Sequence, residues 1–223
     1  AALSVASLKN LKLTLPQKKV LDAAMAEYIT AMEYTADFPS GRYNLALMYQ
    51  AQGQTDKAID TYEQSIEIDT LFFPAKNNLA MLYNAKGENE RAEKLFVQIL
   101  EDHPEMHDIA YSLGLLLVEE KKFDQALLAL ERAAQGLPGR ARIHYNLGLL
   151  YLDADPFPQG GSNMTTLVRL ERAKTYFDEY RDLPGADLAL VDERVRELNK
   201  LVKKEKKRLK NAEKKKTEKD DDW

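Results

Sequence analysis

The chain has 223 residues, of which 44% are hydrophobic and 30% are charged, and its formal net charge is −4. This length suffices for one large domain or one continuous array of repeats. The sequence contains no cysteine, which excludes disulfides, thiolate zinc sites, cysteine nucleophiles and haem attached through a C-x-x-C-H motif within these residues. Glycine and proline are sparse, with 10 and 8 residues, and this favours helices over sheets.

The charge is unevenly distributed along the chain. From Lys203 to Trp223 there are ten lysines and arginines against six acidic residues, whereas the residues before Lys203 carry an acidic excess of eight. An acidic body has no general electrostatic reason to bind nucleic acid. The basic run of residues 203–216 is interrupted by Glu205 and Glu213 and contains no aromatic residue, so we interpret it as a solvated helical tail.

The N-terminal residues do not follow the pattern of the later ones. Residues 1–15 predict an irregular helix or the remnant of an upstream domain, and the missing initiator methionine leads us to expect a piece of a longer protein. Thr14 as the cap, Pro16 in the first turn and Gln17 in a capping box predict a helix start. This helix should run to about Tyr34, within a half-repeat of residues 16–38.

A motif of leucine followed by alanine or glycine recurs with a period of 34 residues. It begins at Leu45, Leu79, Leu113 and Leu147. A second column follows at Ala58, Ala92 and Ala126, and its last member is delayed to Ala173. Small residues allow neighbouring helices to approach closely, and the large residues beside them fill the remaining space. These columns predict repeats of two antiparallel helices.

The repeat period divides the rest of the chain. Four units are predicted, at residues 39–72, 73–106, 107–140 and 141–184, the last with a loop insert at 153–165. Residues 185–208 predict a capping helix that covers the last repeat with one apolar stripe of Leu188, Val191, Val195, Leu198 and Val202. Residues 209–223 predict a polar, disordered tail.

From about Pro39 to Asp153 the sequence resembles the tetratricopeptide-repeat family. The resemblance implies an all-α fold, a right-handed α–α superhelix or tetratricopeptide solenoid with a long C-terminal capping helix. The alternative is a non-repetitive helical bundle. In this family the first helices of the repeats line a concave groove, which here implies a peptide-binding surface of Tyr43, Asn44, Leu47, Asn77, Asn78, Met81, Tyr111, Ser112, Leu115, Tyr145, Asn146 and Leu149.

Two polar columns run along this predicted groove. Tyr43, Tyr111 and Tyr145 form one column and offer large amphipathic contact areas. The neighbouring column carries asparagine in three repeats and serine at Ser112. Asparagine could pair with the backbone of an extended peptide or could bond neighbouring helices, and both interpretations stay open. The columns together predict a protein or peptide partner and a role as an interaction scaffold.

Other kinds of site are not predicted. Chaperone-binding members of the family hold a carboxylate with basic groove residues, but here Arg42, Lys76 and Arg142 lie outside the matching columns. The three histidines have no accompanying ligand set, so we expect packing or surface roles for them. Carboxylate pairs lie on exposed turns and no nucleophile motif occurs, so we predict no enzyme, no metal and no cofactor.

A narrower resemblance covers the start of the repeats. Residues 15–53 look like the entry to the repeat domain of bacterial multihaem c-type cytochromes. This resemblance implies an alternative function, a non-haem interaction module of a larger electron-transfer protein. The compartment is then the periplasm, and otherwise the cytoplasm.

Overall fold

The computed structural model describes residues 13–154 and 164–220, the last six of these by their backbone alone. Within these ranges the chain forms ten α-helices and no strand. The predicted irregular helix of residues 1–15 and most of the insert 153–165 lie outside the described residues. None of the described helices combines the length and the apolar character that crossing a membrane requires. The chain divides between Pro104 and Glu105 into two compact units, called here the N-terminal and the C-terminal unit.

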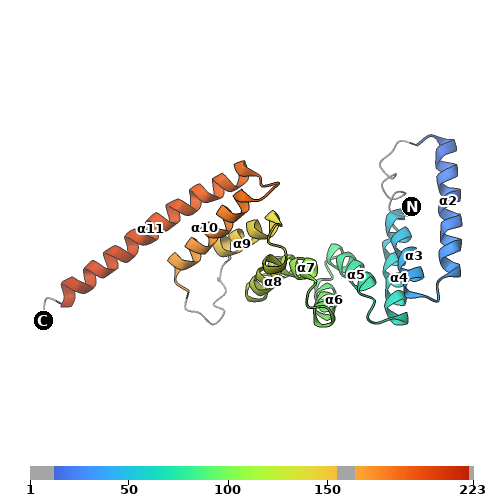
Figure 1. The fold of residues 1–223 in the computed structure, drawn as a ribbon, viewed down its shortest axis with the longest axis horizontal. Helices are drawn as coiled ribbons and strands as arrows, with labels where there is room; N and C mark the ends of the chain where they lie inside the picture. Colours follow the sequence, from blue (N-terminus) through green and yellow to red (C-terminus); the bar gives the residue numbers. More distant parts are fainter. Residues whose placement is uncertain (1–12, 155–163, 221–223) are drawn as a thin grey trace. The chain divides into compact units, whose positions relative to one another are not determined.

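The N-terminal unit contains two helical hairpins preceded by a single helix (Figure 1). Each hairpin joins a first and a second helix through a short turn. Its helices are α2 (Leu15–Tyr34), α3 (Pro39–Gln52), α4 (Thr55–Ile68), α5 (Phe73–Ala85) and α6 (Asn89–Asp102).

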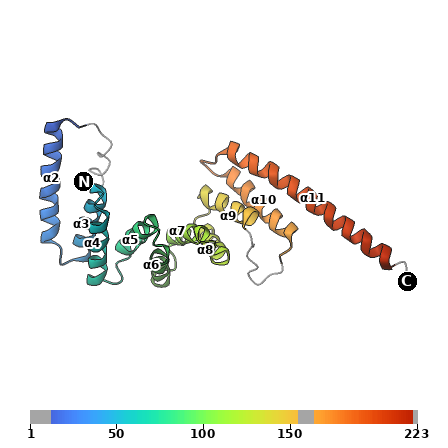
Figure 2. The ribbon, with the colours of Figure 1, turned by 180° about the vertical axis from the view of Figure 1, so that it is seen from behind.

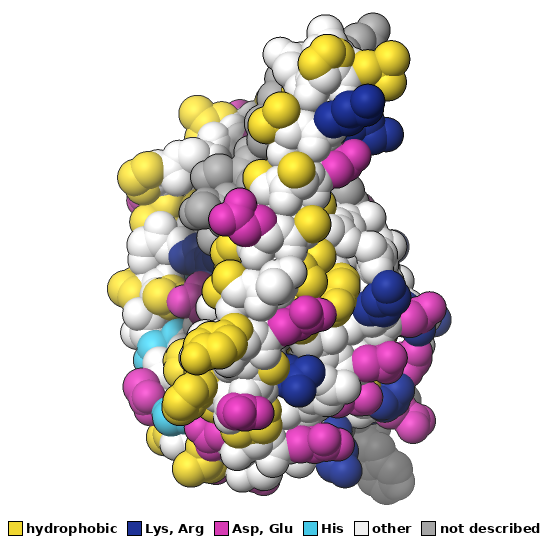
Figure 3. Space-filling model, turned by 90° about the vertical axis from the view of Figure 1, so that its right-hand side faces the viewer, with side chains coloured by type: hydrophobic (Ala, Val, Ile, Leu, Met, Phe, Trp, Pro, Cys, Tyr) yellow, Lys and Arg dark blue, Asp and Glu magenta, His cyan; other side chains and the backbone are white. Residues whose placement is uncertain are grey.

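Helix α2 begins where the sequence predicts. The backbone amide of Thr14 donates to Oε1 of Gln17 at 2.9 Å, which satisfies an amide that the helix leaves unpaired. No side chain of α2 is buried, and Figure 3 shows the end of the molecule that carries this helix, with hydrophobic side chains exposed on it. Ala24 is exposed although its counterpart Ala58 is fully buried. The difference arises because, within the described residues, no helix precedes α2 to cover this face.

The C-terminal unit contains two further hairpins and a long final helix (Figures 1 and 2). Its helices are α7 (His107–Glu119), α8 (Phe123–Gly136), α9 (Ala141–Asp153), α10 (Thr166–Asp182) and α11 (Leu188–Asp220). Helix α11 packs along α10.

The core of each unit lies inside and between the hairpins. Ala46, Ala80, Gly114 and Gly148 occupy one position of the four first helices, and the two alanines are fully buried. A Cβ atom placed on Gly148 would come within 2.6 Å of the ring of Phe177, which is itself fully buried on α10. Close helix approach at this column is therefore the reason for its small residues.

Helix α11 covers the last hairpin, but its stripe and its length differ from the sequence prediction. Val191, Val195 and Leu198 are buried as expected, whereas Leu188 is 55% exposed because it begins the helix beyond the packed face. The helix was predicted to end at residue 208, with a disordered tail from 209. It continues instead to Asp220, because lysine, glutamate and alanine are strong helix formers even without packing. Residues 221–223 lie outside the described residues.

The first helices of three repeats end in the same left-handed turn. Gly53, Gly87 and Lys121 occupy equivalent positions with φ angles of 75°, 77° and 58°. After α7, for example, the amide of Lys122 donates to the carbonyl of Leu117 at 2.9 Å, as Glu88 does to Tyr83 after α5. Glycine adopts this conformation without steric cost, whereas Lys121 is strained there.

Replacement of this strained lysine by glycine should stabilise the protein. We expect Lys121→Gly to raise the free energy of unfolding by about 1 kcal/mol, the approximate cost of a left-handed non-glycine residue. Urea denaturation followed by circular dichroism measures the change. The reverse substitution, Gly87→Lys, should lower the free energy of unfolding by a similar amount, and equal stability of both variants and the parent would refute the strain.

Candidate functional site

The predicted groove residues lie on the first helices of the hairpins, α3 and α5 in the N-terminal unit and α7 and α9 in the C-terminal unit. None of the twelve is buried, in contrast to the adjacent leucine column, and Met81 is the most open with 57% exposure. Partial exposure leaves these side chains accessible to a ligand. Their individual contacts decide which of them are already engaged within the fold.

Asparagines of the groove column bond neighbouring helices in both units. In the N-terminal unit, Nδ2 of Asn78 donates to the hydroxyls of Tyr43 at 3.3 Å and of Tyr62 at 3.2 Å. In the C-terminal unit, Nδ2 of Asn146 donates to the hydroxyl of Tyr111 at 3.0 Å. The structure therefore brings the tyrosine and asparagine columns together, and it supports the interpretation that these asparagines bond neighbouring helices.

Tyr62 anchors the bond in the N-terminal unit. Its side chain is fully buried, and burial raises the pKa of its hydroxyl far above the usual value. The protonated hydroxyl donates to Oε1 of Gln50 at 2.8 Å while it accepts from Asn78. The hydroxyl is thus paired on both sides, which a buried polar group requires.

A second polar set, which the sequence reasoning missed, joins helices α4, α5 and α6. The Tyr83 hydroxyl donates to Glu63. Arg91 donates to the Tyr83 hydroxyl and also, at 2.9 Å, to Oε1 of Glu63. The Arg91 guanidinium also lies 3.9 Å from the centre of the Tyr83 ring. Burial raises the pKa of the Tyr83 hydroxyl, so it remains a donor at neutral pH.

The same set recurs in the C-terminal unit. The Tyr151 hydroxyl donates to Oε1 of Glu131 at 2.8 Å and accepts from Arg172 at 3.1 Å. Burial again raises the pKa of the tyrosine hydroxyl. In both units the glutamate precedes the tyrosine by 20 residues, and the arginine directly precedes the repeat alanine, Ala92 or Ala173. This spacing is the feature of the sequence from which the glutamate–tyrosine–arginine set could have been predicted.

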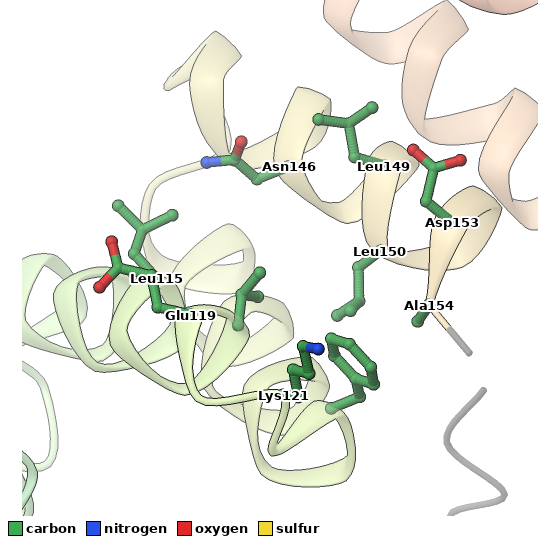
Figure 4. A pocket seen from close by; sticks show the side chains of 10 residues that line it. Leu115, Glu119, Lys121, Asn146, Leu149, Leu150, Asp153 and Ala154 are labelled. Carbon is green, nitrogen blue, oxygen red and sulfur yellow. The ribbon is translucent and has the colours of Figure 1, made fainter. Parts of the chain in front are cut away.

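A hollow of about 350 Å³ lies in the C-terminal unit between α7 and α9 (Figure 4). Its walls are mostly apolar, with two carboxylates, one amide and one ammonium group. The lining residues are Leu115, Val118, Glu119, Lys121, Phe123, Asn146, Leu149, Leu150, Asp153 and Ala154.

Three of the predicted groove residues, Leu115, Asn146 and Leu149, line this hollow. Tyr145 does not, because its ring packs against Phe177 and Tyr180 at centroid distances of 5.8 and 5.2 Å. The predicted residues of α3 and α5 belong to the other unit, where they stay predictions. Sequence reasoning missed Glu119, Lys121 and Asp153, which lie at the C-terminal ends of α7 and α9.

Two of the three basic residues near the groove are used within the fold. Lys76 is buried and pairs with Asp102 at 3.4 Å, and Nε of Arg42 donates to the carbonyl of Ala36 at 2.9 Å. Neither side chain is therefore available as part of a carboxylate clamp.

The histidines have packing contacts. His144 is buried, with Nδ1 at 2.9 Å from Glu179 and Nε2 at 3.0 Å from the carbonyl of Pro138. His103 packs edge-on against Phe73, and His107 fills the space beside Gly136. Among the described residues, no group of three or more histidine or acidic side chains is placed to hold a metal ion.

The tyrosine–asparagine bonds should contribute measurably to stability. Asn78→Ala leaves the hydroxyls of Tyr43 and Tyr62 without their donor, so we expect the free energy of unfolding to fall by about 1–3 kcal/mol. Asn44→Ala is the control, since Asn44 shares the column without such a bond in the described structure. Urea denaturation of both variants measures the difference, and equal losses would contradict the assigned role.

The comparisons with known proteins identify the repeats. Family models described as tetratricopeptide repeat match residues 39–69 and residues 77–141, so these segments carry tetratricopeptide repeats. No curated protein sequence matches the chain.

Several solved structures have folds similar to this chain. A structure of MamA has a TM-score of 0.61 at 20% identity, with 77% of this chain and 95% of that chain covered. MamA from Desulfovibrio magneticus RS-1 has a TM-score of 0.58 at 14% identity, with 83% and 100% covered. YrrB, described as a tetratricopeptide-repeat protein with an unusual peptide-binding site, has a TM-score of 0.61 at 19% identity, with 88% and 92% covered. At these identities the likeness concerns the fold, and the predicted all-α solenoid class is confirmed.

Proposed function

We propose that this chain is a non-enzymatic interaction scaffold that binds a peptide or protein partner on the concave surface of its tetratricopeptide repeats. Two findings support the proposal. The family models match most of the residues between 39 and 141. YrrB, which has a similar fold, is described as having a peptide-binding site.

The hollow between α7 and α9 is the observation that carries the proposal. Apolar side chains from both helices form its walls, and a few polar groups surround them (Figure 4). Recognition sites for peptides and small ligands commonly combine an apolar surface with few polar groups that fix orientation. Leu115 and Leu149 face this space from equivalent positions of consecutive repeats.

The ionisable groups support binding rather than catalysis. Burial raises the pKa of Tyr62, Tyr83 and Tyr151, and each of these hydroxyls is already bonded between helices. Such groups keep their protons at neutral pH. Their perturbed pKa values therefore report packing.

The comparisons provide no support for the resemblance to multihaem cytochromes. The matching family models are repeat models, and the similar structures named above are MamA and YrrB. The electron-transfer alternative therefore has no supporting observation.

Selection of binding peptides tests the proposal. A phage-displayed random peptide library is panned on the whole chain, and the affinity of a selected peptide is measured by fluorescence anisotropy. We expect Leu149→Ser to weaken binding about tenfold or more, because a leucine contact with a buried ligand contributes roughly 1.5–3 kcal/mol.

Leu128→Ser is the matched control for this experiment. Leu128 lies on α8 of the same unit, is 70% exposed and does not line the hollow. Its substitution should leave the affinity unchanged, and circular dichroism should show the same helix content for both variants. Failure to select any peptide, or equal affinities for both variants, would contradict the proposal.

A further inference from the structure

We propose that the hollow between α7 and α9 binds a segment of a partner protein in which one large apolar side chain stands next to an arginine or lysine. This inference rests on the proposed function and specifies the ligand. It follows from the apolar walls of the hollow, from the two carboxylates among its lining residues and from a difference in charge between the two units.

The size of the hollow suits one large side chain. At about 350 Å³ it lies near the lower end of the range for ligand pockets in proteins, roughly 300–1,000 Å³. Leu115 from α7 and Leu149 from α9 line it, and Leu150 points into it from α9 (Figure 4). A leucine, methionine or phenylalanine of the partner would therefore be surrounded by apolar atoms on several sides.

One repeat position sets the charge at the opening. The four first helices carry Ala51, Ala85, Glu119 and Asp153 at equivalent positions, 34 residues apart. Only the C-terminal unit therefore has carboxylates at this position. Figure 4 shows Glu119 on the α7 side and Asp153 on the α9 side of the same hollow.

The polar groups of the hollow are mainly hydrogen-bond acceptors. Asn146 uses its amide nitrogen for Tyr111, and this leaves its carbonyl oxygen as an acceptor beside the two carboxylates. Lys121 is the one cationic residue among those that line the hollow. Two negative charges against one positive charge favour a cationic ligand.

The charged side chains around the hollow form ion pairs with one another or bond to the backbone. Arg194 on α11 lies near Asp153 but pairs with Glu197 at 3.2 Å, and Lys122 pairs with Glu120 at 2.8 Å. Arg169 donates to the carbonyl of Leu152 at 3.2 Å. Counted together with these groups the charges balance, so the acidic excess is confined to the residues that line the hollow.

Asp153 is exposed on α9, so a cation of the ligand can reach its carboxylate. Desolvation raises the pKa of its carboxyl, and Arg194 only partly opposes this effect. A ligand cation beside Asp153 would restore favourable interactions to the charged carboxylate. Arginine suits this position because its aliphatic stem can follow the leucine wall while its guanidinium reaches the carboxylates.

The turn after α7 differs from the equivalent turns of the N-terminal unit. Gly53 and Gly87 occupy the equivalent turn position in the N-terminal unit, where glycine adopts the left-handed conformation without strain. The C-terminal unit instead has a lysine whose side chain lines the hollow.

Short labelled peptides test the ligand class on the whole chain. Gly/Ser peptides with a central Arg-Leu-Arg, Glu-Leu-Glu or Arg-Ser-Arg are titrated by fluorescence anisotropy at low and high salt. We expect the Arg-Leu-Arg peptide to bind most tightly and to weaken as salt rises, because partly exposed ion pairs are screened. Equal binding of the Glu-Leu-Glu peptide would overturn the proposal.

Variants of the chain should shift this affinity in opposite directions. Glu119→Gln and Asp153→Asn should each weaken Arg-Leu-Arg binding about threefold, as expected for a partly exposed ion pair. Lys121→Gln removes the like charge and should strengthen it by a similar factor. Asp60→Asn, an exposed carboxylate on α4, is the control and should change nothing. Changes of the same sign in all three variants would overturn the proposal.

Two further outcomes separate this inference from the proposed function. If library peptides without basic residues bind at the hollow, the ligand class is wrong and the scaffold function stands. A peptide of residues 203–216 is also titrated, because Leu209 lies there between Arg208 and Lys210. If it binds more tightly than every foreign peptide, the occupant is a second copy of this chain and a foreign partner is excluded.

Discussion

Every helical hairpin of this chain has apolar faces that it cannot bury alone, and the close packing of consecutive helices resolves this constraint. Close packing requires small residues where the helices approach, as at Ala46, Ala80, Gly114 and Gly148. Within each unit the consecutive helices then pack closely, and the residues beside the leucine column remain partly exposed. The partly exposed surface beside the leucine column thus follows from the packing requirement of the repeats.

Polar bonds reinforce this packing in a pattern with twice the repeat period. The tyrosine–asparagine bond and the glutamate–tyrosine–arginine set both occur between the hairpins of the N-terminal unit and again in the C-terminal unit. In the intermediate register, one repeat after the first bonds and one before the second, both sets lack their partners. Asn77 and Ser112 stand where the tyrosine–asparagine bond has tyrosine and asparagine, and Leu117 stands where the glutamate–tyrosine–arginine set has tyrosine. The boundary between the two compact units, after Pro104, falls in this register.

The sequence predicted the helices well because the repeat period reports packing directly. The leucine, alanine and glycine columns identify which faces are buried, and the structure buries them. The prediction failed where packing does not decide the structure, as in α11 beyond residue 208, where helix propensity alone extends the helix. Ala24 lies 34 residues before the buried Ala58 and is nevertheless exposed, because the periodic pattern does not show whether a covering helix is present.

The candidate site was predicted only in part, because side-chain contacts between repeats are not visible in a periodic pattern. Leu115, Asn146 and Leu149 were identified from the family geometry, and all three line the hollow. The bond from Asn146 to Tyr111 needed three-dimensional distances, as did the positions of Glu119 and Asp153. The sequence column that has Ala51 and Ala85 in the first two repeats has these carboxylates in the last two. This charge difference gains meaning only from the structure, which places the column beside the hollow.

The central claim is that the concave face of α7 and α9 holds the partner. Amide chemical shifts of the whole chain, recorded during titration with a selected peptide, test it most directly. We expect the largest changes at Leu115, Glu119, Leu149 and Asp153, on the two helices that form the hollow. Changes confined to α8 and α10, or to the N-terminal unit, would contradict the account.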